Sequence, residues 1–358
     1  MKTYNNLYKK LCSIENLRLA YSKARLGKSK RDYVASFESD LQNNLRNLHE
    51  ELINKTYSPS QMKKFVVRDP KTRIIHASIF RDRIVHHAII NIINPIYEKI
   101  FICDSFASRK NKGTQVAIER FEYFVRKVSS NGELVKNSLN NNQIKGYVLK
   151  ADFRHYFDSV NQEILIKILK KKIKDEDLIL LIRKVLSNFE ISEQTGMPLG
   201  NYTSQFFANI YLNELDYYVK HVLKAKYYIR YVDDFVILHE SKKRLEFFIE
   251  HINLFLPCLK IKLHPDKTEI LPLRNGITFL GYRIFYHYRL LRKRNIRTFT
   301  RKLEKNISLC KNKEITEEQL ESRINGWMGY AKFGDTWNFR EKILRSHCVG
   351  VIFKENII

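Results

Sequence analysis

Apolar residues along the chain follow two different spacings, and each spacing predicts one type of element. Helical spacing appears in residues 1–60, 84–100, 162–188, 207–218 and 245–255. Runs rich in β-branched and aromatic residues, typical of strands, appear in residues 65–67, 74–75, 146–152, 227–238 and 261–286. Together the two spacings predict a chain that contains both helices and strands.

Turn and cap residues indicate where several of these elements begin and end. Pro70 lies between the first two strand runs, which predicts a hairpin with cations at its tip. Ser241 is a candidate N-cap for a helix that ends at Pro257, and Asn275-Gly276 predicts a turn between later strands. After these strands the pattern is helical, and residues 316–319 match a capping box.

The charge balance adds a prediction about partners. Lys and Arg total 64 against 38 Asp and Glu, which gives a formal net charge of +26, and 44% of the 358 residues are hydrophobic. This hydrophobic content is ample for a packed core, so disorder is not expected. Because binding to phosphates releases condensed counterions, the charge excess predicts a polyanionic partner. A basic protein without such a partner is the alternative.

The cysteines and the apolar runs predict the cellular location of the protein. The five cysteines are isolated, with no CxxC pair and no histidine at zinc-site spacing, so we expect reduced core thiols at Cys12, Cys103, Cys258, Cys310 and Cys348. The N-terminus shows no apolar signal segment, and no apolar stretch approaches the ~20 residues of a membrane span. We expect a cytoplasmic protein with no membrane partner.

Asp152 and Asp233 carry the candidate chemistry. Asp152 ends one predicted strand, and Asp233 lies beside Asp234 at a predicted hairpin tip, so adjacent strands of one antiparallel sheet would bring the acids together. Buried adjacent carboxylates are costly unless cations neutralise them, and their hard oxygen ligands suit Mg²⁺. Two divalent ions held there would activate an attacking hydroxyl and stabilise a leaving pyrophosphate. In a basic chain this arrangement favours polymerase chemistry.

Six motifs resemble those of the reverse transcriptases and follow the order of that family over nearly the whole chain. They are residues 71–73, 152–159, 196–205, 231–234, 264–268 and 279–282. The resemblance implies an α+β right-hand polymerase fold. It assigns residues 1–145 to N-terminal helices and fingers, 146–286 to a palm built on an antiparallel sheet, and 287–358 to a short helical thumb. Residues 161–195 are a further candidate part of the fingers.

The resemblance also implies a role for each motif. The catalytic acids are Asp152, Asp233 and Asp234. Two Mg²⁺ ions, which Mn²⁺ can replace, are held by Asp152, Asp233 and the backbone carbonyl of Phe153. The incoming nucleotide is contacted by Lys71, Arg73, Phe157, Gly200, Gln205 and Lys267. The primer grip is Phe279, Leu280, Gly281 and Tyr282. We expect the nucleic-acid backbone to contact Arg109, Lys110, Lys112, Arg292, Lys293, Arg294 and Arg297, because these cations occupy a polar loop and a helical run without acids.

Several of these positions have a structural alternative. Phe157 is the implied steric gate against a ribose 2′-hydroxyl, or else a core aromatic. Gly200 either serves a turn or lets the backbone approach a nucleotide closely. Asp234 is either a metal ligand or a structural turn acid. The tryptophans Trp327 and Trp337 are expected in the thumb core.

Residues 199–205 narrow the resemblance to one group of reverse transcriptases. Their Gly-xxx-Ser-Gln form is similar to that of diversity-generating retroelements, as are residues 104–114 and 327–337. These enzymes copy RNA with errors at adenines. The partners implied are an RNA template, a DNA or RNA primer, dNTPs, a structured non-coding RNA and a small accessory protein. An antiviral-defence reverse transcriptase and a catalytically silent RNA-binding scaffold are the alternatives, and the intact acids argue against the scaffold.

Overall fold

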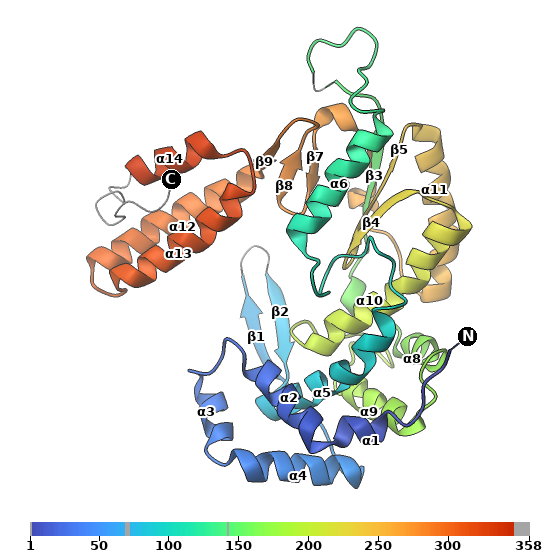
Figure 1. Ribbon diagram of the computed structural model, residues 1–358, viewed down its shortest axis with the longest axis vertical. Helices are drawn as coiled ribbons and strands as arrows, with labels where there is room; N and C mark the ends of the chain where they lie inside the picture. Colours follow the sequence, from blue (N-terminus) through green and yellow to red (C-terminus); the bar gives the residue numbers. More distant parts are fainter. Residues whose placement is uncertain (1, 69–71, 142, 347–358) are drawn as a thin grey trace. The chain divides into compact units, whose positions relative to one another are not determined.

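The computed structural model of the chain describes residues 2–68, 72–141 and 143–346 (Figure 1). Its described residues fall into two compact units. Unit one comprises Met1–Gly113, Lys150–Val236 and Glu246–Glu269, and unit two comprises Thr114–Leu149, Ile237–Leu245 and Ile270 onwards. Helices and antiparallel strands are both present, which confirms the predicted α+β class. The division into fingers, palm and thumb stays a prediction.

Unit one begins with four helices, of which the first three pack against a long buried helix. The four helices are α1 (Tyr8–Cys12), α2 (Ile14–Arg25), α3 (Asp32–Glu38) and α4 (Leu41–Ile53). The Ser13 side chain caps α2 by accepting from the Asn16 backbone N–H at 3.2 Å. The buried helix is α5 (Phe80–Tyr97), which packs against α2 and α10 (Tyr202–Tyr217). Its Asp82 is fully buried and accepts from the Tyr57 hydroxyl at 2.9 Å.

The predicted first hairpin is confirmed as β1 (Lys63–Val67) paired with β2 (Arg73–Ala77). The predicted helix over 162–188 is two helices instead, α8 (Gln162–Lys170) and α9 (Glu176–Ser187). Asp175 causes the break, because its carboxylate caps α9 at the Leu178 N–H (3.1 Å) and also accepts from the Leu7 N–H (2.6 Å). The same side chain therefore starts a helix and fixes the N-terminal segment.

A four-stranded sheet positions the predicted acids. Its strand order is β4-β5-β3-β6, where β3 is Tyr147–Asp152, β4 Tyr227–Tyr231, β5 Asp234–His239 and β6 Glu269–Pro272. A two-residue turn joins β4 to β5, which confirms the hairpin predicted there. Short helical turns follow the strands and helices: α7 (Tyr156–Ser159), a π turn (Tyr218–Val222) and 3₁₀ turns at Leu256–Leu259, Pro265–Lys267 and Leu273–Asn275. The predicted helix before Pro257 is α11 (Lys242–Phe255).

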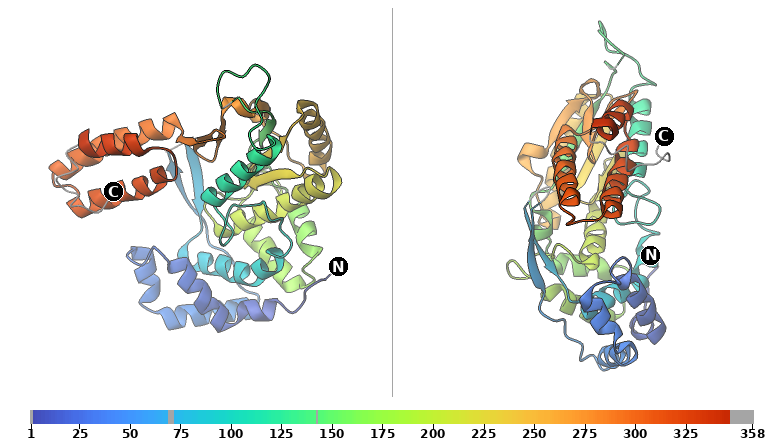
Figure 2. Two further views of the ribbon diagram at one scale, coloured as in Figure 1. Left: turned by 45° about the horizontal axis from the view of Figure 1, so that its top comes forward. Right: turned by 90° about the vertical axis from the view of Figure 1, so that its left-hand side faces the viewer.

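Unit two contains a second sheet and the C-terminal helices. Its elements are α6 (Thr114–Val128), β7 (Ile277–Phe279), β8 (Tyr282–Ile284), β9 (Arg289–Leu291), α12 (Lys293–Lys311), α13 (Glu317–Lys332) and α14 (Trp337–Ser346). The three strands pair in the order β7-β8-β9. The capping box predicted at Thr316 is confirmed at the start of α13. In both views of Figure 2 the helices α12 and α13 lie side by side.

The helices α12, α13 and α14 share a small core, which comprises Phe299, Leu303, Leu320, Ile324, Met328 and Ile343. Trp327 stacks on Phe299 with a centroid distance of 3.6 Å, which confirms its core position. The prediction for Trp337 is wrong, because this residue begins α14 and is 55% exposed.

The cysteine prediction holds only in part. Cys12 is a buried free thiol, whereas Cys103, in a connecting segment, and Cys258, in the 3₁₀ turn Leu256–Leu259, are exposed. Cys310 is half-buried, and Cys348 lies outside the described residues. Within the described ranges, no helix combines the length and the apolar character that a bilayer span requires.

Candidate active site

The three predicted acids line one cavity of about 790 Å³ in unit one. Asp152 is the last residue of β3, Asp233 lies in the β4–β5 turn, and Asp234 begins β5. The strand order places β3 beside β5, which explains why these acids meet. The same cavity is lined by other predicted site residues, namely Arg73, Phe153, Phe157, Gly200, Gln205 and Lys267.

Backbone pairing brings Lys267 to Asp152. The carbonyl of Asp152 accepts from the His264 N–H at 2.7 Å, and the Arg154 N–H donates to the carbonyl of Lys262 at 2.9 Å. These bonds extend the pairing of β3 beyond its end and set the 3₁₀ turn Pro265–Lys267 beside the cavity. The Lys267 ammonium forms an ion pair with the Asp152 carboxylate. Phe153 and Leu263 lie opposite each other in this antiparallel pair, but the two hydrogen bonds join the residues on either side of them. The carbonyl of Phe153 therefore faces away from Leu263.

Burial and mutual repulsion make the acid cluster costly when it is ionised. Burial raises the pKa of Asp234 to about 6, and the charges of Asp233 and Asp152 add to that effect. The pKa of Asp233 is also raised, first by burial and then by Asp152, while Arg73 and Lys267 act in the opposite direction. At neutral pH the cavity therefore holds negative charge that the protein only partly compensates, and an added cation would lower its energy.

The chemistry of these donors fits a hard divalent cation. Carboxylate oxygens are the ligands that Mg²⁺ prefers, and Mg²⁺ sites commonly use one or two carboxylates together with water and substrate phosphates. Among the described residues, no three His, Cys, Asp or Glu side chains are grouped so as to hold an ion by themselves. Asp152 and Asp233 would therefore hold such an ion together with ligands from solvent or substrate. The role of the Phe153 carbonyl stays a prediction.

The turn that carries Asp233 is strained. Val232 has φ 54°, a left-handed conformation that a β-branched residue rarely adopts and that costs on the order of 1–3 kcal/mol. Such strain persists only where the surroundings enforce the conformation. Here the fully buried Arg230 donates from Nη1 to the carbonyl of Val232 at 3.1 Å.

Comparison with known protein families identifies the family of this chain. Residues 62–284, more than half of the chain, match the family described as reverse transcriptase (RNA-dependent DNA polymerase). The chain belongs to this family. It is therefore an RNA-directed DNA polymerase.

Two curated relatives and one solved structure illustrate the similarity. Protein YkfC of Escherichia coli is 27% identical over 292 residues, which cover 70% of this chain and 72% of YkfC. The group II intron-encoded protein LtrA of Lactococcus lactis is 23% identical over 313 residues, covering 67% of this chain and 49% of LtrA. A structure of telomerase from Candida tropicalis with a fragment of telomeric RNA covers 67% of this chain and 47% of that chain, at 12% identity and a TM-score of 0.46.

Phe157 and Gly200 form part of the cavity wall of this reverse transcriptase. Phe157 is half-buried in α7, and its ring meets the buried Tyr156 ring edge-on at a centroid distance of 5.3 Å. Gly200 has φ +120°, and a Cβ there would lie 2.6 Å from Cγ2 of Ile75. Glycine at 200 is therefore needed for the close approach of this loop to β2. Its nucleotide contact, like the sugar selection by Phe157, stays a prediction.

The basic loop before α6 contains one residue, Arg109, that does not have its predicted role. Arg109 was expected to contact nucleic-acid phosphates, but its side chain is only 6% exposed. Its guanidinium donates to both carboxylate oxygens of Glu98 at 2.8–3.1 Å and to the carbonyls of Ile102 (2.7 Å) and Ser105 (2.8 Å). The prediction for Arg109 is wrong, because these bonds use the guanidinium within the fold.

The neighbouring cations differ in how far they are engaged. Lys112 donates to the carbonyl of Cys103 at 2.8 Å, whereas Lys110 is exposed. Gln205 is exposed in the first turn of α10 and accepts from the Ser108 hydroxyl at 3.1 Å. Contacts of these residues with substrate stay predictions, and Lys71 lies outside the described residues.

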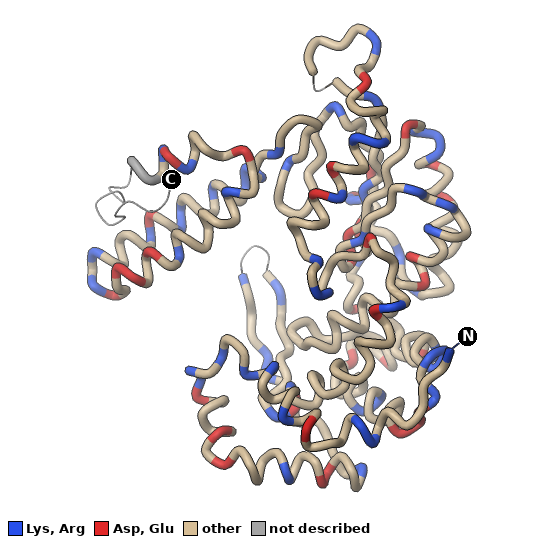
Figure 3. Tube along the Cα trace, viewed as in Figure 1, with Lys and Arg blue, Asp and Glu red and all other residues tan. Residues whose placement is uncertain are grey.

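The predicted primer grip is the tight turn between β7 and β8 in unit two. Phe279 and Tyr282 are buried at its two ends, and Leu280 (φ 46°) and Gly281 (φ 94°) form the turn. The carbonyl of Gly281 accepts from the Arg292 N–H at 3.1 Å, which joins the turn to the start of α12. The predicted backbone-binding residues Arg292, Lys293, Arg294 and Arg297 are exposed there. Figure 3 shows Lys and Arg recurring along α12.

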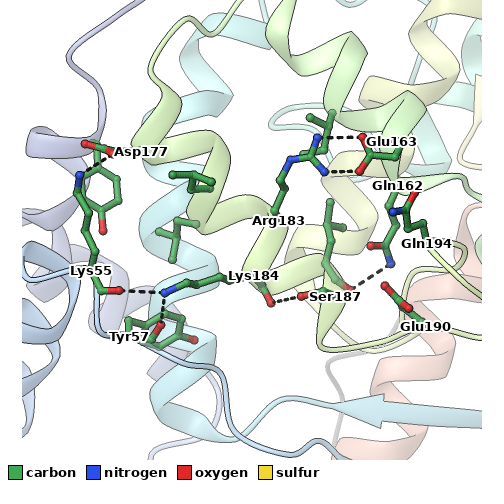
Figure 4. Close-up of a pocket in the computed structure, with 15 residues that line it drawn as sticks. Lys55, Tyr57, Gln162, Glu163, Asp177, Arg183, Lys184, Ser187, Glu190 and Gln194 are labelled. Carbon is green, nitrogen blue, oxygen red and sulfur yellow. Dashed lines mark hydrogen bonds and ion pairs between the residues drawn. The ribbon is translucent and has the colours of Figure 1, made fainter.

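A second cavity of unit one, about 390 Å³, lacks such an acid cluster (Figure 4). Its charged groups are largely paired with one another: Arg183 with Glu163, and Lys55 with Asp177 at 2.7 Å. Lys184 donates to the carbonyl of Lys55 at 2.9 Å. These contacts connect α8 and α9 with the segment after α4. We therefore interpret this cavity as a packing gap between these elements and not as a second active site.

Proposed function

We propose that this reverse transcriptase copies an RNA template into DNA, with Asp152 and Asp233 as the principal ligands of two Mg²⁺ ions. The observation that carries the proposal is the convergence of Asp152, Asp233 and Asp234 from two adjacent strands on one cavity. The raised pKa of Asp233 and Asp234 supports it, because burying acids that repel each other is unfavourable unless a cation or substrate offsets the cost.

In the proposed reaction the primer 3′-hydroxyl oxygen forms a bond to the α-phosphorus of a deoxynucleotide. The bond from that phosphorus to the bridging oxygen breaks, pyrophosphate leaves, and the hydroxyl proton passes to solvent. Bound Mg²⁺ would lower the hydroxyl pKa and neutralise charge on the leaving group. Arg73 and Lys267, which line the same cavity, would bind the triphosphate oxygens. Phe157 would pack beneath the sugar and exclude a 2′-hydroxyl.

Primer extension on an RNA template tests this proposal. Asp233→Asn keeps the side-chain shape and removes the charge, so extension should fall by at least about 10³-fold while binding to an RNA–DNA duplex persists. Asp32→Asn is the matched control, because Asp32 is exposed at the start of α3, outside the six motifs and outside the cavity lining. Unmutated extension rates in Asp233→Asn would contradict the assignment. No extension by the unmutated protein would favour the scaffold alternative.

We further propose that the enzyme serves a diversity-generating retroelement. The supporting observations are the Gly-xxx-Ser-Gln form of residues 200–205 and the position of Gly200 and Gln205 on the wall of the acid-lined cavity. The proposal includes a structured non-coding RNA, a small accessory protein and the cytoplasmic location expected from the sequence. The relative LtrA is a group II intron-encoded protein, and the proposed diversity-generating role is narrower than that similarity.

Sequencing of the cDNA distinguishes the biological roles. A diversity-generating enzyme should misincorporate at template adenines far more often than at other bases, and a small basic protein should co-purify with it. Uniform fidelity, together with recovery of a dedicated non-coding RNA and no small protein, would instead favour the antiviral-defence alternative.

A further inference from the structure

A charged side chain lies in the sheet where an apolar one would be expected. Arg230 belongs to β4, directly before Tyr231, and is 0% exposed. Its guanidinium forms a two-point ion pair with Asp216 of α10, from Nη2 to Oδ2 at 2.6 Å and from Nε to Oδ1 at 2.7 Å. Asp216 is also 0% exposed, and it accepts from the Tyr228 hydroxyl at 2.7 Å. Both charges are therefore compensated inside the fold.

The other end of the guanidinium reaches the turn that carries the acids. Nη1 donates to the carbonyl of Val232 at 3.1 Å and to Oδ1 of Asn209 at 3.0 Å. Asn209 is fixed in turn, because its amide donates to the carbonyl of Ala107 at 2.9 Å. The backbone of Arg230 is held as well, since its N–H donates to the carbonyl of Asp104 and its carbonyl accepts from the Phe106 N–H, each at 3.0 Å.

The bond to Val232 acts on the next residue through the peptide plane. The carbonyl of Val232 and the N–H of Asp233 belong to one planar peptide unit, so a hydrogen bond to that carbonyl restricts the orientation of the backbone at Asp233. The constraint matters here because Val232 is left-handed (φ 54°) and would relax to a commoner conformation if it were released. Relaxation would move the carboxylate of Asp233 relative to Asp152.

We propose that Arg230 is a positioning residue which, with Asp216 as its counter-ion, holds the strained turn so that Asp233 faces Asp152 across the cavity. The inference rests on the proposed function. It also explains why the sheet contains a buried ion pair at all. Such pairs contribute little stability compared with apolar residues of similar size, whereas the donors of arginine can hold two acceptors in fixed directions at once.

Three variants separate positioning from packing. Arg230→Met combined with Asp216→Leu replaces the ion pair with apolar volume and leaves no buried charge unpaired. Arg230→Lys keeps a positive charge for Asp216 but cannot reach Val232 at the same time. Glu214→Gln is the control, because Glu214 lies on α10 like Asp216 but forms a partly exposed ion pair with Lys171 at the end of α8, away from the turn.

Mn²⁺ binding followed by electron paramagnetic resonance, without nucleic acid, is the first measurement. We expect the dissociation constant to rise about 10-fold or more in the double variant and in Arg230→Lys, and to be unchanged in Glu214→Gln. The maximal extension rate should fall about 100-fold in the same two variants with the KM for dNTP within about 2-fold, because misplacing the acid affects the reaction more than nucleotide binding.

Amide hydrogen exchange of residues 231–234 needs neither metal nor substrate and is the deciding measurement. Exchange should be faster in Arg230→Lys than in the unmutated protein, and unchanged in Glu214→Gln. If exchange and Mn²⁺ affinity both match the unmutated values, Arg230 only packs the core and the inference is wrong. Should the double variant fail to fold, Arg230→Lys alone decides. An unmutated protein that extends no primer would refute the proposed function. The exchange comparison would still test whether Arg230 positions the turn.

Discussion

Asp234 is the acid whose ionisation the fold disfavours most clearly, and replacing it tests the electrostatic account of the cavity. Its pKa of about 6 lies well above the ordinary 3.8 because the side chain is buried beside Asp233 and Asp152. Asparagine has nearly the same shape and no charge. We therefore expect Asp234→Asn to raise the free energy of unfolding at neutral pH, even though it changes the candidate active site.

The pH dependence gives the sign and the size of this effect. Below about pH 4 the carboxyl group is protonated in both the folded and the unfolded chain, and it carries no penalty. Between about pH 4 and pH 6 the unfolded chain releases the proton while the folded chain retains it, so the unmutated protein loses stability as the pH rises. Above about pH 6 the loss is complete. A pKa difference of about 2, at about 1.4 kcal/mol for each unit, corresponds to about 3 kcal/mol, which residual exposure reduces to about 2 kcal/mol.

Urea unfolding from pH 4 to pH 8 without divalent ions measures this difference. The advantage of Asp234→Asn should be near zero at pH 4, grow to about 2 kcal/mol by pH 7 and stay level above it. Asp266→Asn, whose side chain is 87% exposed, should show no such growth. Added Mg²⁺ should narrow the gap by stabilising the unmutated protein more than the variant, because only the unmutated cavity retains the third negative charge. An advantage that is absent, or that does not change with pH, would refute the account.

Three further outcomes are expected. Phe157→Val should lower the discrimination of dATP over ATP opposite template uridine by about 10-fold or more while extension persists; an unchanged ratio would show that sugar selection lies elsewhere. Replacing Arg292, Lys293, Arg294 and Arg297 with Ala should lower the slope of log affinity against log salt concentration for template–primer binding by up to about 4. Arg109→Ala should leave this slope unchanged and should lower the free energy of unfolding by about 1–3 kcal/mol. Gly200→Ala should destabilise the fold by about 2 kcal/mol more than Gly113→Ala. Both glycines have φ near +120°, but only at Gly200 would an added Cβ meet a neighbour, Ile75. Equal costs would argue against this contact.

The acid-lined cavity could be predicted from the sequence because its parts are local patterns in a fixed order. Asp152 ends a run of apolar residues, and Asp233-Asp234 interrupts another, so each acid is recognisable without knowledge of the rest of the chain. The strand order β4-β5-β3 then brings them together. Periodicity also identified α5, and two β-rich runs on either side of Pro70 identified the hairpin of β1 and β2.

The missed features depend on partners that are distant along the chain or on another element. Arg109 belongs to a basic loop, but Glu98 and two carbonyls engage its guanidinium. The break between α8 and α9 depends on Asp175, which also binds backbone N–H groups near the N-terminus. Arg230 did carry a signal, since a lone cation within the apolar run 227–238 must find a buried acid. Its partner Asp216 is an acid among the apolar residues of α10.

The pairing of Lys267 with Asp152 has a consequence for the order of binding. One oxygen of Asp152 faces the Lys267 ammonium, so this carboxylate cannot offer both oxygens to a metal ion until that contact opens. A bare cation would have to compete with the ammonium and would then leave Lys267 without its counter-ion. A nucleotide with Mg²⁺ would bring both charges at once: its metal would take the place of the ammonium at Asp152, and its phosphates would accept hydrogen bonds from the ammonium. We therefore expect the cavity to bind the metal–nucleotide complex more tightly than either component alone, because only the complex would restore every charge pair that it breaks.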